Sequence, residues 1–290
     1  MRLVHLSDLH FGRHDEHLAA GLAAELSAQN PDLVVVSGDF AQVGTSSEFT
    51  AARAFLDTIS APVFAIPGNH DVPAINLFER FFNPYRQYRR YISPELEPFL
   101  ELGGVALAGL NTSRRIRLGL DWSHGSISRG QLRRLEERFA KAAPDAVRVV
   151  VAHHPLLQPE VAMTSPMHIV KRANLALETF AQLGVRMVLS GHFHLSYVRR
   201  HARPNETPIK EGEPSGPREA AAADILVVQA SSTISTRLRG EPNAYNLIDI
   251  ENGVIVIAVR EWRESGWSTR EQAVAPAEVP SPSPAVAAAV

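Results

Sequence analysis

Short runs of apolar residues alternate along the chain with longer stretches in which apolar residues recur at helical spacing. The first three runs are Leu3–Leu6, Leu33–Val36 and Val63–Ile66. Later runs of the same kind are Val105–Leu110, Val147–Val151, Arg186–Leu189, Ile225–Val228, Tyr245–Ile250 and Val254–Val259. Runs of this length, punctuated by helical stretches, predict buried strands in an α/β fold.

Four stretches carry apolar residues at the spacing of a helix. Two lie early in the chain, over residues 18–26 and 49–56, and two follow later, from about Ser128 to Ala143 and from about Asn174 to Leu183. Beyond residue 225 the strands follow one another without helices between them. This part of the chain therefore predicts an antiparallel contribution, and we expect a second sheet.

Metal-capable residues directly follow five of the predicted strands. In chain order these are Asp8-Leu9-His10, Gly38-Asp39, Gly68-Asn69-His70-Asp71, His153-His154-Pro155 and Gly191-His192-Phe193-His194. Open α/β sheets bind ligands at the C-terminal ends of their strands, so these side chains share one architectural position. Residues i and i+2 of an extended segment point the same way, which lets Asp8 and His10, or His192 and His194, converge on one ion.

Composition narrows the chemistry of such a site. The 290 residues include twelve histidines and no cysteine, which excludes disulfides, thiolate metal sites and cysteine nucleophiles. Any metal must be held by His, Asp, Glu or Asn. Two carboxylates, one amide and four imidazoles are enough for two cations and too many for one structural zinc. The net charge of −2 provides no basic field for a long nucleic acid.

This ordered set of motifs, which extends over residues 8–194, resembles that of the calcineurin-like metallophosphoesterase superfamily. The Asn-His-Asp-Val stretch and the His-His-Pro motif are most similar to those of the bacterial class III cyclic-nucleotide phosphodiesterases and related glycerophosphodiesterases. The resemblance implies a four-layer αββα sandwich, in which two mixed β-sheets flanked by helices carry a dinuclear metal centre at the strand ends.

Carried over residue by residue, the resemblance also implies which side chains hold the metals. One ion is expected on Asp8, His10, Asp39 and His194, and the other on Asp39, Asn69, His153 and His192, with Asp39 as the bridge. His153 rather than His154 matches the family ligand because the family spacing is His-x-Pro. The expected ions are two divalent or mixed-valence Mn, Fe, Zn or Co.

The resemblance implies hydrolysis of small phosphodiesters, of the cyclic-nucleotide or glycerophosphodiester type, by in-line attack of a metal-bridging hydroxide. Two adjacent ions lower the pKa of a shared water and clamp the phosphate, and His70 would stabilise the developing charge or protonate the leaving oxygen. His70 and Asp39 are thus the expected catalytic residues. Two divalent ions, two carboxylates and a hydroxide leave about +1, which attracts a phosphate anion.

Three other functions remain open: a phosphomonoesterase, a nuclease of the same superfamily, and a non-catalytic scaffold. The balanced charge counts against the nuclease. A scaffold is expected to lose metal ligands, whereas all seven positions are filled here. We therefore expect a small phosphate ester, rather than a long nucleic acid, as the partner.

Several residues near the motifs have two interpretations. His124 either contacts substrate or is incidental, and His154 either contacts the ligand histidines or packs beside a proline. Asp71 is expected to orient His70 or to cap a helix. The remaining histidines are expected to be surface or packing residues, namely His5, His14, His17, His168 and His201.

Residues 76–91 form an unusual stretch in which aromatic residues alternate with arginines. Such interleaving can bind nucleotides by stacking and phosphate contact. The interpretation we favour is an amphipathic stretch whose aromatics pack on the core and whose arginines stay solvated. A role at the substrate rim or in a homo-oligomer interface stays open. Arg114, Arg115 and Arg117 form a smaller basic cluster, which we expect to be a solvated loop.

Residues 1–270 are predicted to form one catalytic domain. Within it, residues 201–224 lack periodicity and predict a flexible insertion, with a lid or partner contact as the alternative. Residues 271–290 are predicted to be a disordered tail rich in Ala and Pro. The N-terminus is too polar for a signal peptide, and no run approaches the roughly 20 apolar residues of a transmembrane helix. A cytoplasmic protein with no membrane partner is therefore expected.

Overall fold

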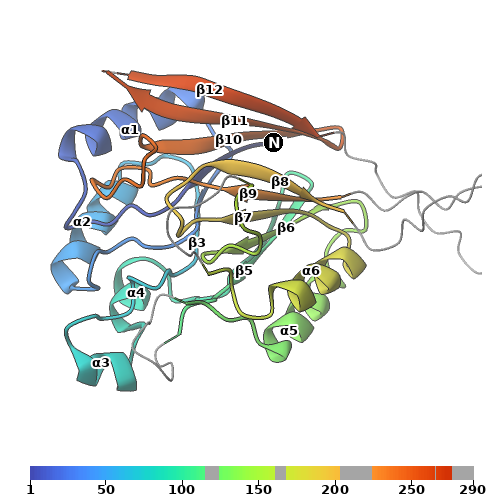
Figure 1. The fold of residues 1–290 in the computed structure, drawn as a ribbon, viewed down its shortest axis with the longest axis horizontal. Coiled ribbons are helices and arrows are strands. Elements are labelled where there is room, and N and C mark those ends of the chain that lie inside the picture. The colour runs from blue at the N-terminus through green and yellow to red at the C-terminus, as the bar shows by residue number, and fades with distance from the viewer. Residues whose placement is uncertain (115–123, 161–167, 203–223, 265, 276–290) are drawn as a thin grey trace, which may run out of the picture.

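The computed structural model describes residues 1–114, 124–160, 168–202, 224–264 and 266–275. Two six-stranded mixed sheets stack face to face (Figure 1). The strand order is β12-β11-β10-β1-β2-β3 in the first sheet and β4-β5-β6-β7-β9-β8 in the second. No helix in these ranges is long and apolar enough to cross a membrane.

The first sheet contains the parallel strands β1 (Arg2–Leu6), β2 (Leu33–Val36) and β3 (Val63–Ala65), extended by the antiparallel strands β10 (Ala244–Glu251), β11 (Val254–Arg263) and β12 (Gly266–Ala275). The second contains β4 (Phe99–Leu102), β5 (Val105–Leu110), β6 (Val147–Ala152), β7 (Val185–Ser190), β8 (Tyr197–His201) and β9 (Ile225–Gln229). In this sheet β5, β6, β7 and β9 are parallel, and β4 and β8 are antiparallel edge strands.

Helices cover the outer faces of both sheets, so the expected αββα sandwich is confirmed. The helices are α1 (Glu16–Gln29), α2 (Ser46–Leu56), α3 (Leu77–Phe82), α4 (Arg86–Tyr91), α5 (Arg129–Phe139) and α6 (Ala173–Gln182). The apolar faces of α1 and α2 pack on the first sheet, and those of α5 and α6 pack on the second. A third apolar cluster, which includes Leu3, Val35 and Val149, fills the space between the sheets.

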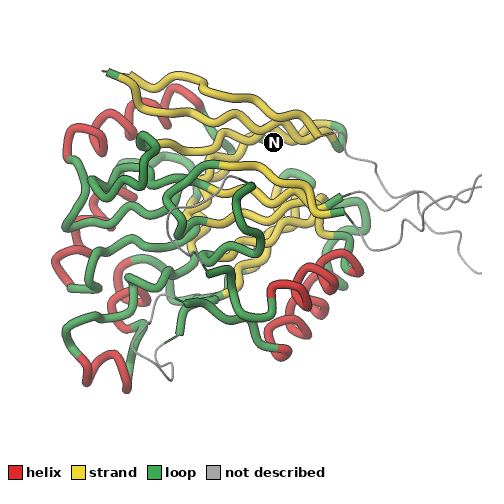
Figure 2. Tube along the Cα trace, viewed as in Figure 1, coloured by secondary structure: helices red, strands yellow, loops and turns green. Residues whose placement is uncertain are grey.

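Local sequence explains where the predicted helices begin. The Asp15 carboxylate accepts hydrogen bonds from the first turn of α1, and Thr45 and Ser128 form capping boxes with Glu48 and Gln131 at the starts of α2 and α5. The four helices therefore form close to their predicted ranges. Loops gather at the carboxyl ends of the parallel strands, on the left of Figure 2.

The later part of the chain confirms one expectation and corrects another. The antiparallel contribution of the late strands is confirmed, because β10, β11 and β12 extend the first sheet from β1, and the expected second sheet is present. The strand β12 continues to Ala275, five residues into the range 271–290 expected to be disordered, because it pairs with β11 from Ile255 to Arg263. Residues 276–290 lie outside the described residues.

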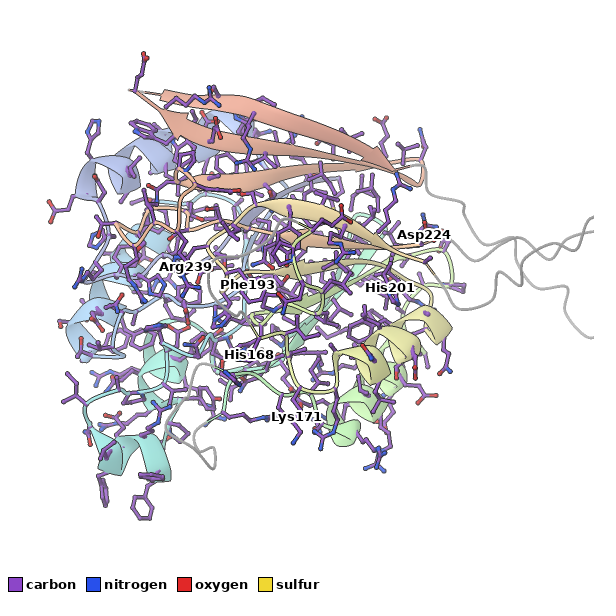
Figure 3. All side chains as sticks on the ribbon, viewed as in Figure 1. His168, Lys171, Phe193, His201, Asp224 and Arg239 are labelled. Atoms are coloured by element: carbon purple, nitrogen blue, oxygen red, sulfur yellow. The ribbon has the colours of Figure 1, made fainter. Side chains whose placement is uncertain are left out.

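Most of the predicted insertion 201–224 also lies outside the described residues. Its two flanks, His201 and Asp224, lie at one end of the second sheet, and Arg239, in the loop after β9, lies at the other end (Figure 3). His201 closes β8, where it pairs with Ile225 at the start of β9. The insertion therefore begins and ends at the amino end of β9, whereas the candidate site follows the carboxyl end of that strand.

The stretch 76–91 folds as two short helices, and its side chains divide differently from our expectation. Arg80 is buried and donates to the carbonyls of Val72 and Pro73, whereas Phe78 and Phe82 are 74% and 73% exposed. Phe78, Phe81 and Phe82 are spaced i, i+3 and i+4, so they share one face of α3, and that face is exposed while Arg80 is buried. Only Tyr88, on α4, is an aromatic of this stretch that the core buries completely. Arg115 and Arg117 lie outside the described residues.

Candidate metal centre

The side chains that follow five of the parallel strands, β1, β2, β3, β6 and β7, converge at one edge of the two sheets. Three groups of metal-capable atoms, each within 4.8 Å of one another, overlap there: Asp8 with His10 and His194, Asp8 with Asp39 and His153, and His10 with Asp39 and His70. A fourth group joins His153 with His154 and His192. Asn69 is also at this edge, with its Oδ1 3.0 Å from His153 Nε2. The structure thus brings all seven predicted metal ligands together.

Asp39 occupies the middle of this arrangement. Its Oδ2 lies 3.7 Å from His10 Nε2 on one side and 3.3 Å from His153 Nε2 on the other. Asp8 Oδ1 lies 3.2 Å from His194 Nε2 and 3.7 Å from His10 Nε2. Carboxylates and imidazoles from segments far apart in the sequence therefore face a common buried space.

The backbone at the site is strained. Asp8, His10, Asp39, His192 and His194 all have positive φ, between 49° and 76°, and they are five of the nine non-glycine residues with this conformation in the described ranges. Side chains other than glycine adopt it at a cost, and such residues cluster at functional sites. This corrects our expectation of extended backbone: Asp8 and His10, like His192 and His194, converge because tight turns redirect them.

Glycines permit the close approach of these turns. A Cβ at Gly68 would overlap the Asp39 carboxylate, and one at Gly191 would overlap the hydroxyl of Ser7 and lie 2.6 Å from Asp8 Oδ2. Gly38 has a φ of +104°, and a Cβ added there would also crowd the Gly68 backbone and the His153 ring. Each of these positions therefore excludes a larger residue.

Second hydrogen bonds fix the orientation of two imidazoles. The Nδ1 of His153 lies 2.8 Å from the carbonyl of Ser37, and the Nδ1 of His194 lies 2.8 Å from the carbonyl of Arg237. A carbonyl only accepts, so both Nδ1 atoms carry a proton and both Nε2 atoms face oxygen atoms of the site. Metal-binding histidines use this arrangement, in which the second nitrogen donates to a backbone carbonyl.

The donor set fits a pair of divalent or trivalent cations. Asp8 Oδ1 is buried and accepts no hydrogen bond, although a buried carboxylate oxygen without a partner costs free energy. Imidazole lone pairs that face carboxylate and amide oxygens at 3.0–3.3 Å repel unless a proton or a cation lies between them. Oxygen and imidazole nitrogen ligands suit Mn, Fe, Zn and Co.

The pKa values of His192 and Asp8 are set by burial and by the neighbouring imidazoles. Burial lowers the pKa of His192 to about 3, with the positive charge of His153 adding to the effect, so this imidazole is neutral and able to bind a cation. Burial by itself raises the pKa of Asp8, but the imidazoles of His194 and His10 outweigh it and hold that pKa well below its usual range. Both effects favour the protonation states that metal ligands need.

His70 lies beside the centre and is half-buried. Its Nδ1 donates to the carbonyl of Gln42 at 2.6 Å, its backbone N–H donates to Asp39 Oδ1, and its ring meets that of His10 edge-on at 4.8 Å. The Nε2 atom is therefore left to face the site. The contact of His70 with substrate stays a prediction.

Asp71 neither orients His70 nor caps a helix, contrary to both expectations. It is fully buried, and its two carboxylate oxygens accept the backbone N–H groups of Asp39, Ala41 and Gly68. Asp71 thus ties the turn after β2 to the turn after β3. Burial and the nearby Asp39 carboxylate raise the pKa of Asp71 to about 7.

The other histidines take less direct positions. His154 is buried; its Nδ1 lies 2.7 Å from Thr112 Oγ1, and its ring contacts that of His192 at 4.6 Å. The His124 ring lies 4.2 Å from that of His168, tilted by 44°, and His124 belongs to none of the metal-capable clusters of the described residues. Its contact with substrate stays a prediction.

Sequence reasoning missed Arg237, which lies in the loop after β9. Its Nη1 lies 3.3 Å from His70 Nε2, and its carbonyl accepts from His194. The signal was present, because β9 runs parallel to β7 and ends at the same edge of the sheet. The rule that identified the other five segments therefore also applied to the segment after Gln229. Figure 3 shows Arg239 of this loop at the same end of the strands as Phe193.

Comparison with known proteins agrees with this geometry. Over 212 residues the chain is 26% identical to a cAMP/cGMP dual specificity phosphodiesterase of Mycobacterium tuberculosis, a match that covers 67% of this chain and 62% of that protein. It is 36% identical over 107 residues to the glycerophosphodiester phosphodiesterase GpdQ of Enterobacter lignolyticus, covering 33% of this chain and 35% of that protein. The matches thus span less than two thirds of either relative.

Among solved structures, a purple acid phosphatase from yellow lupin seeds has the same fold, with a TM-score of 0.67 at 13% identity. That likeness covers 94% of this chain and 53% of the phosphatase. Residues 1–196, which include all five motifs, match the profile of the calcineurin-like phosphoesterases. The chain therefore belongs to the calcineurin-like phosphoesterase family.

Proposed function

We propose that this chain is a metal-dependent phosphodiesterase that hydrolyses small phosphodiesters of the cyclic-nucleotide or glycerophosphodiester type. The observation that carries the proposal is the position of Asp39, whose Oδ2 faces His10 Nε2 on one side and His153 Nε2 on the other. A carboxylate so placed can be shared by two cations. The names of the relatives, a cyclic-nucleotide and a glycerophosphodiester phosphodiesterase, support the substrate class.

The proposed ligand sets are Asp8, His10, Asp39 and His194 for one ion, and Asp39, Asn69, His153 and His192 for the other. Such a pair of ions lowers the pKa of water and neutralises phosphate charge. The protein supplies the orientation: Ser37 and Arg237 hold His153 and His194 by their Nδ1 protons, and Ser7 donates to Asp8 Oδ2 at 2.7 Å. These contacts fix the site before substrate binds.

His70 has the role of a substrate-facing proton carrier. Its Nε2 accepts from Arg237 Nη1 in the substrate-free chain, so it must take up a proton before it protonates the leaving oxygen. Because Gln42 holds its Nδ1, the atom that exchanges a proton with the leaving oxygen is Nε2. Hydrolysis forms a bond from water oxygen to phosphorus and breaks the ester P–O bond. One water proton ends on the leaving oxygen, and the product is a phosphomonoester.

A panel of substrates tests the proposal. Purified protein loaded with Mn²⁺ is assayed with bis(p-nitrophenyl) phosphate, p-nitrophenyl phosphate, cyclic AMP, a glycerophosphodiester and single-stranded DNA. The proposal expects hydrolysis of the diesters of low molecular mass. Activity confined to the monoester would exclude a diesterase, activity confined to DNA would favour the nuclease, and a chain that binds less than about one transition metal and hydrolyses nothing would favour the scaffold.

A further inference from the structure

The loop of residues 230–243 lies against the candidate metal centre, and its backbone is held there by hydrogen bonds. Ser232 Oγ donates to the carbonyl of Asp8 at 2.9 Å, and Thr233 Oγ1 donates to that of Ser7 at 3.0 Å. Further along, the Arg237 carbonyl accepts from His194 Nδ1 and its N–H donates to Ser235 Oγ at 3.1 Å. The backbone of Arg237 is thus fixed relative to the site.

The guanidinium of Arg237 lies at the site without a carboxylate partner. It is half-buried, and Nη1 donates to His70 Nε2 at 3.3 Å. Among the described residues no carboxylate lies within 4.0 Å of it, whereas Arg2, Arg260 and Arg270 are each paired with an acidic side chain. A guanidinium carries five donors in a planar fork, and one donor contacts His70. The other N–H donors of the guanidinium are available to an anion.

The charge of this guanidinium changes which anion fits. Two divalent ions, the two carboxylates of Asp8 and Asp39 and a hydroxide sum to about +1, and Arg237 raises the sum to about +2. A phosphodiester carries one negative charge, whereas a phosphomonoester carries about two at neutral pH because its second pKa is about 6. The geometry of a guanidinium also matches two oxygen atoms of one phosphate.

We propose that the Arg237 guanidinium binds the non-bridging oxygens of the substrate phosphate and extends the activity of the site to phosphomonoester dianions. The inference rests on the proposed function, because the same site performs both hydrolyses. Water oxygen bonds to phosphorus, the ester P–O bond breaks, one water proton ends on the leaving oxygen, and the second product is hydrogen phosphate. His70 remains beside the leaving oxygen, and Arg237 contacts the oxygens that do not leave.

Three variants test the assignment. Arg237→Ala removes the guanidinium, and Arg237→Lys keeps the positive charge but loses the paired N–H donors. Arg239→Ala removes an exposed positive charge from the same loop. For each protein, kcat/KM is measured with p-nitrophenyl phosphate and with bis(p-nitrophenyl) phosphate, alongside metal content and thermal unfolding. Titration calorimetry of the metal-loaded proteins with inorganic phosphate gives a readout independent of turnover.

We expect Arg237→Ala to lower kcat/KM for the monoester about 10- to 100-fold, as the loss of charge-assisted hydrogen bonds predicts, and to weaken phosphate binding by a similar factor. For the diester, kcat/KM of Arg237→Ala should fall several-fold less than for the monoester. Arg237→Lys should recover part of the monoester activity, and Arg239→Ala should resemble the wild type. Equal losses for both substrates, or no loss, would overturn the inference, because Arg237 would then only hold His70 or do nothing.

The two proposals fail separately. A wild-type protein that hydrolyses the diester but not the monoester overturns this inference and leaves the proposed function standing. A protein that hydrolyses only the monoester, and loses that activity in Arg237→Ala, overturns the diesterase and supports the role of Arg237. A metal-loaded protein without activity on either substrate overturns both.

Discussion

The Nε2 atom of His153 lies 3.3 Å from Oδ2 of Asp39, and both side chains are buried. The other ring nitrogen of His153 donates to the Ser37 carbonyl, so the group that separates Nε2 from the carboxylate is either a second proton or a cation. Burial by itself lowers the pKa of His153, but the Asp39 carboxylate outweighs it and raises the pKa to about 9. Proton and metal therefore compete for one position.

This competition predicts that metal binding releases a proton from His153. At pH 7.5, below the pKa of about 9, the metal-free imidazole is protonated, and it must become neutral to act as a ligand. Calorimetry of Mn²⁺ binding in buffers with different ionisation enthalpies measures the release. Wild-type protein should release about one proton more than His153→Asn, whose amide has none to lose. Equal release from both proteins would contradict the assignment of His153 as a ligand.

Asp39→Asn and His70→Ala should separate metal binding from turnover. Asp39→Asn removes the shared charge and should reduce both metal content and activity, the latter by at least about 100-fold. Under the proposed function His70 contacts substrate without binding metal, so His70→Ala should lower kcat about 100-fold with metal content unchanged. Elemental analysis and steady-state kinetics on the same preparations decide the matter. A His70→Ala protein that lost its metals would make His70 a ligand.

The sequence predicted those strands and helices whose local pattern of apolar and capping residues fits only one kind of element. The strands before Asp8, Asp39 and His153 are buried on both faces and read as continuous apolar runs, and the main helices have capping residues and a regular apolar face. The edge strands β4 and β8 escaped notice because their residues are only partly buried and mix polar with apolar types. Pairing with a neighbour, rather than local sequence, defines such strands.

The residues of the candidate site could be predicted to lie together for a different reason. The rule that parallel strands end at one edge placed Asp8, Asp39 and His153 together without any knowledge of the turns. It could not show that Asp71 would bind three backbone N–H groups, or that Arg237 would reach His70, because those contacts depend on how two loops pack against each other. Left-handed φ angles at histidine and aspartate are likewise set by tertiary contacts.

Gly191→Ala should damage the site through its backbone. The added Cβ would overlap the Ser7 hydroxyl and crowd the Asp8 carboxylate, which accepts from Ser7 and from the His192 N–H. We expect a loss of about 1–3 kcal/mol in the free energy of unfolding and a fall in metal content. Gly130→Ala is the matched control, since its Cβ would meet nothing closer than 3.7 Å on α5. That variant should gain about 0.5–1 kcal/mol. Urea denaturation measures both, and a Gly191→Ala protein as stable as the wild type would show that the added methyl group does not crowd Asp8.

His5 should make the stability of the fold depend on pH. It is fully buried, Asn246 Nδ2 donates to its Nδ1, and its Nε2 then donates to Ser37 Oγ at 2.9 Å, so the ring is neutral. Burial lowers its pKa to about 3. In the unfolded chain the same ring protonates below about pH 6.5. The unfolded state therefore binds more protons between about pH 6.5 and 3, and the free energy of unfolding falls as the pH falls through this window.

The measurement compares wild type with His5→Gln by urea denaturation at pH 7.5 and 5.5 in the presence of a chelator, which removes the effect of metal loading. Between these two pH values the wild type should lose about 1.4 kcal/mol more than His5→Gln, because only the wild type carries the buried imidazole. His17→Gln makes the same chemical change at an exposed position and should behave as the wild type does. If His5→Gln and the wild type lose equal amounts, His5 is protonated in the folded state or the ring is accessible to water.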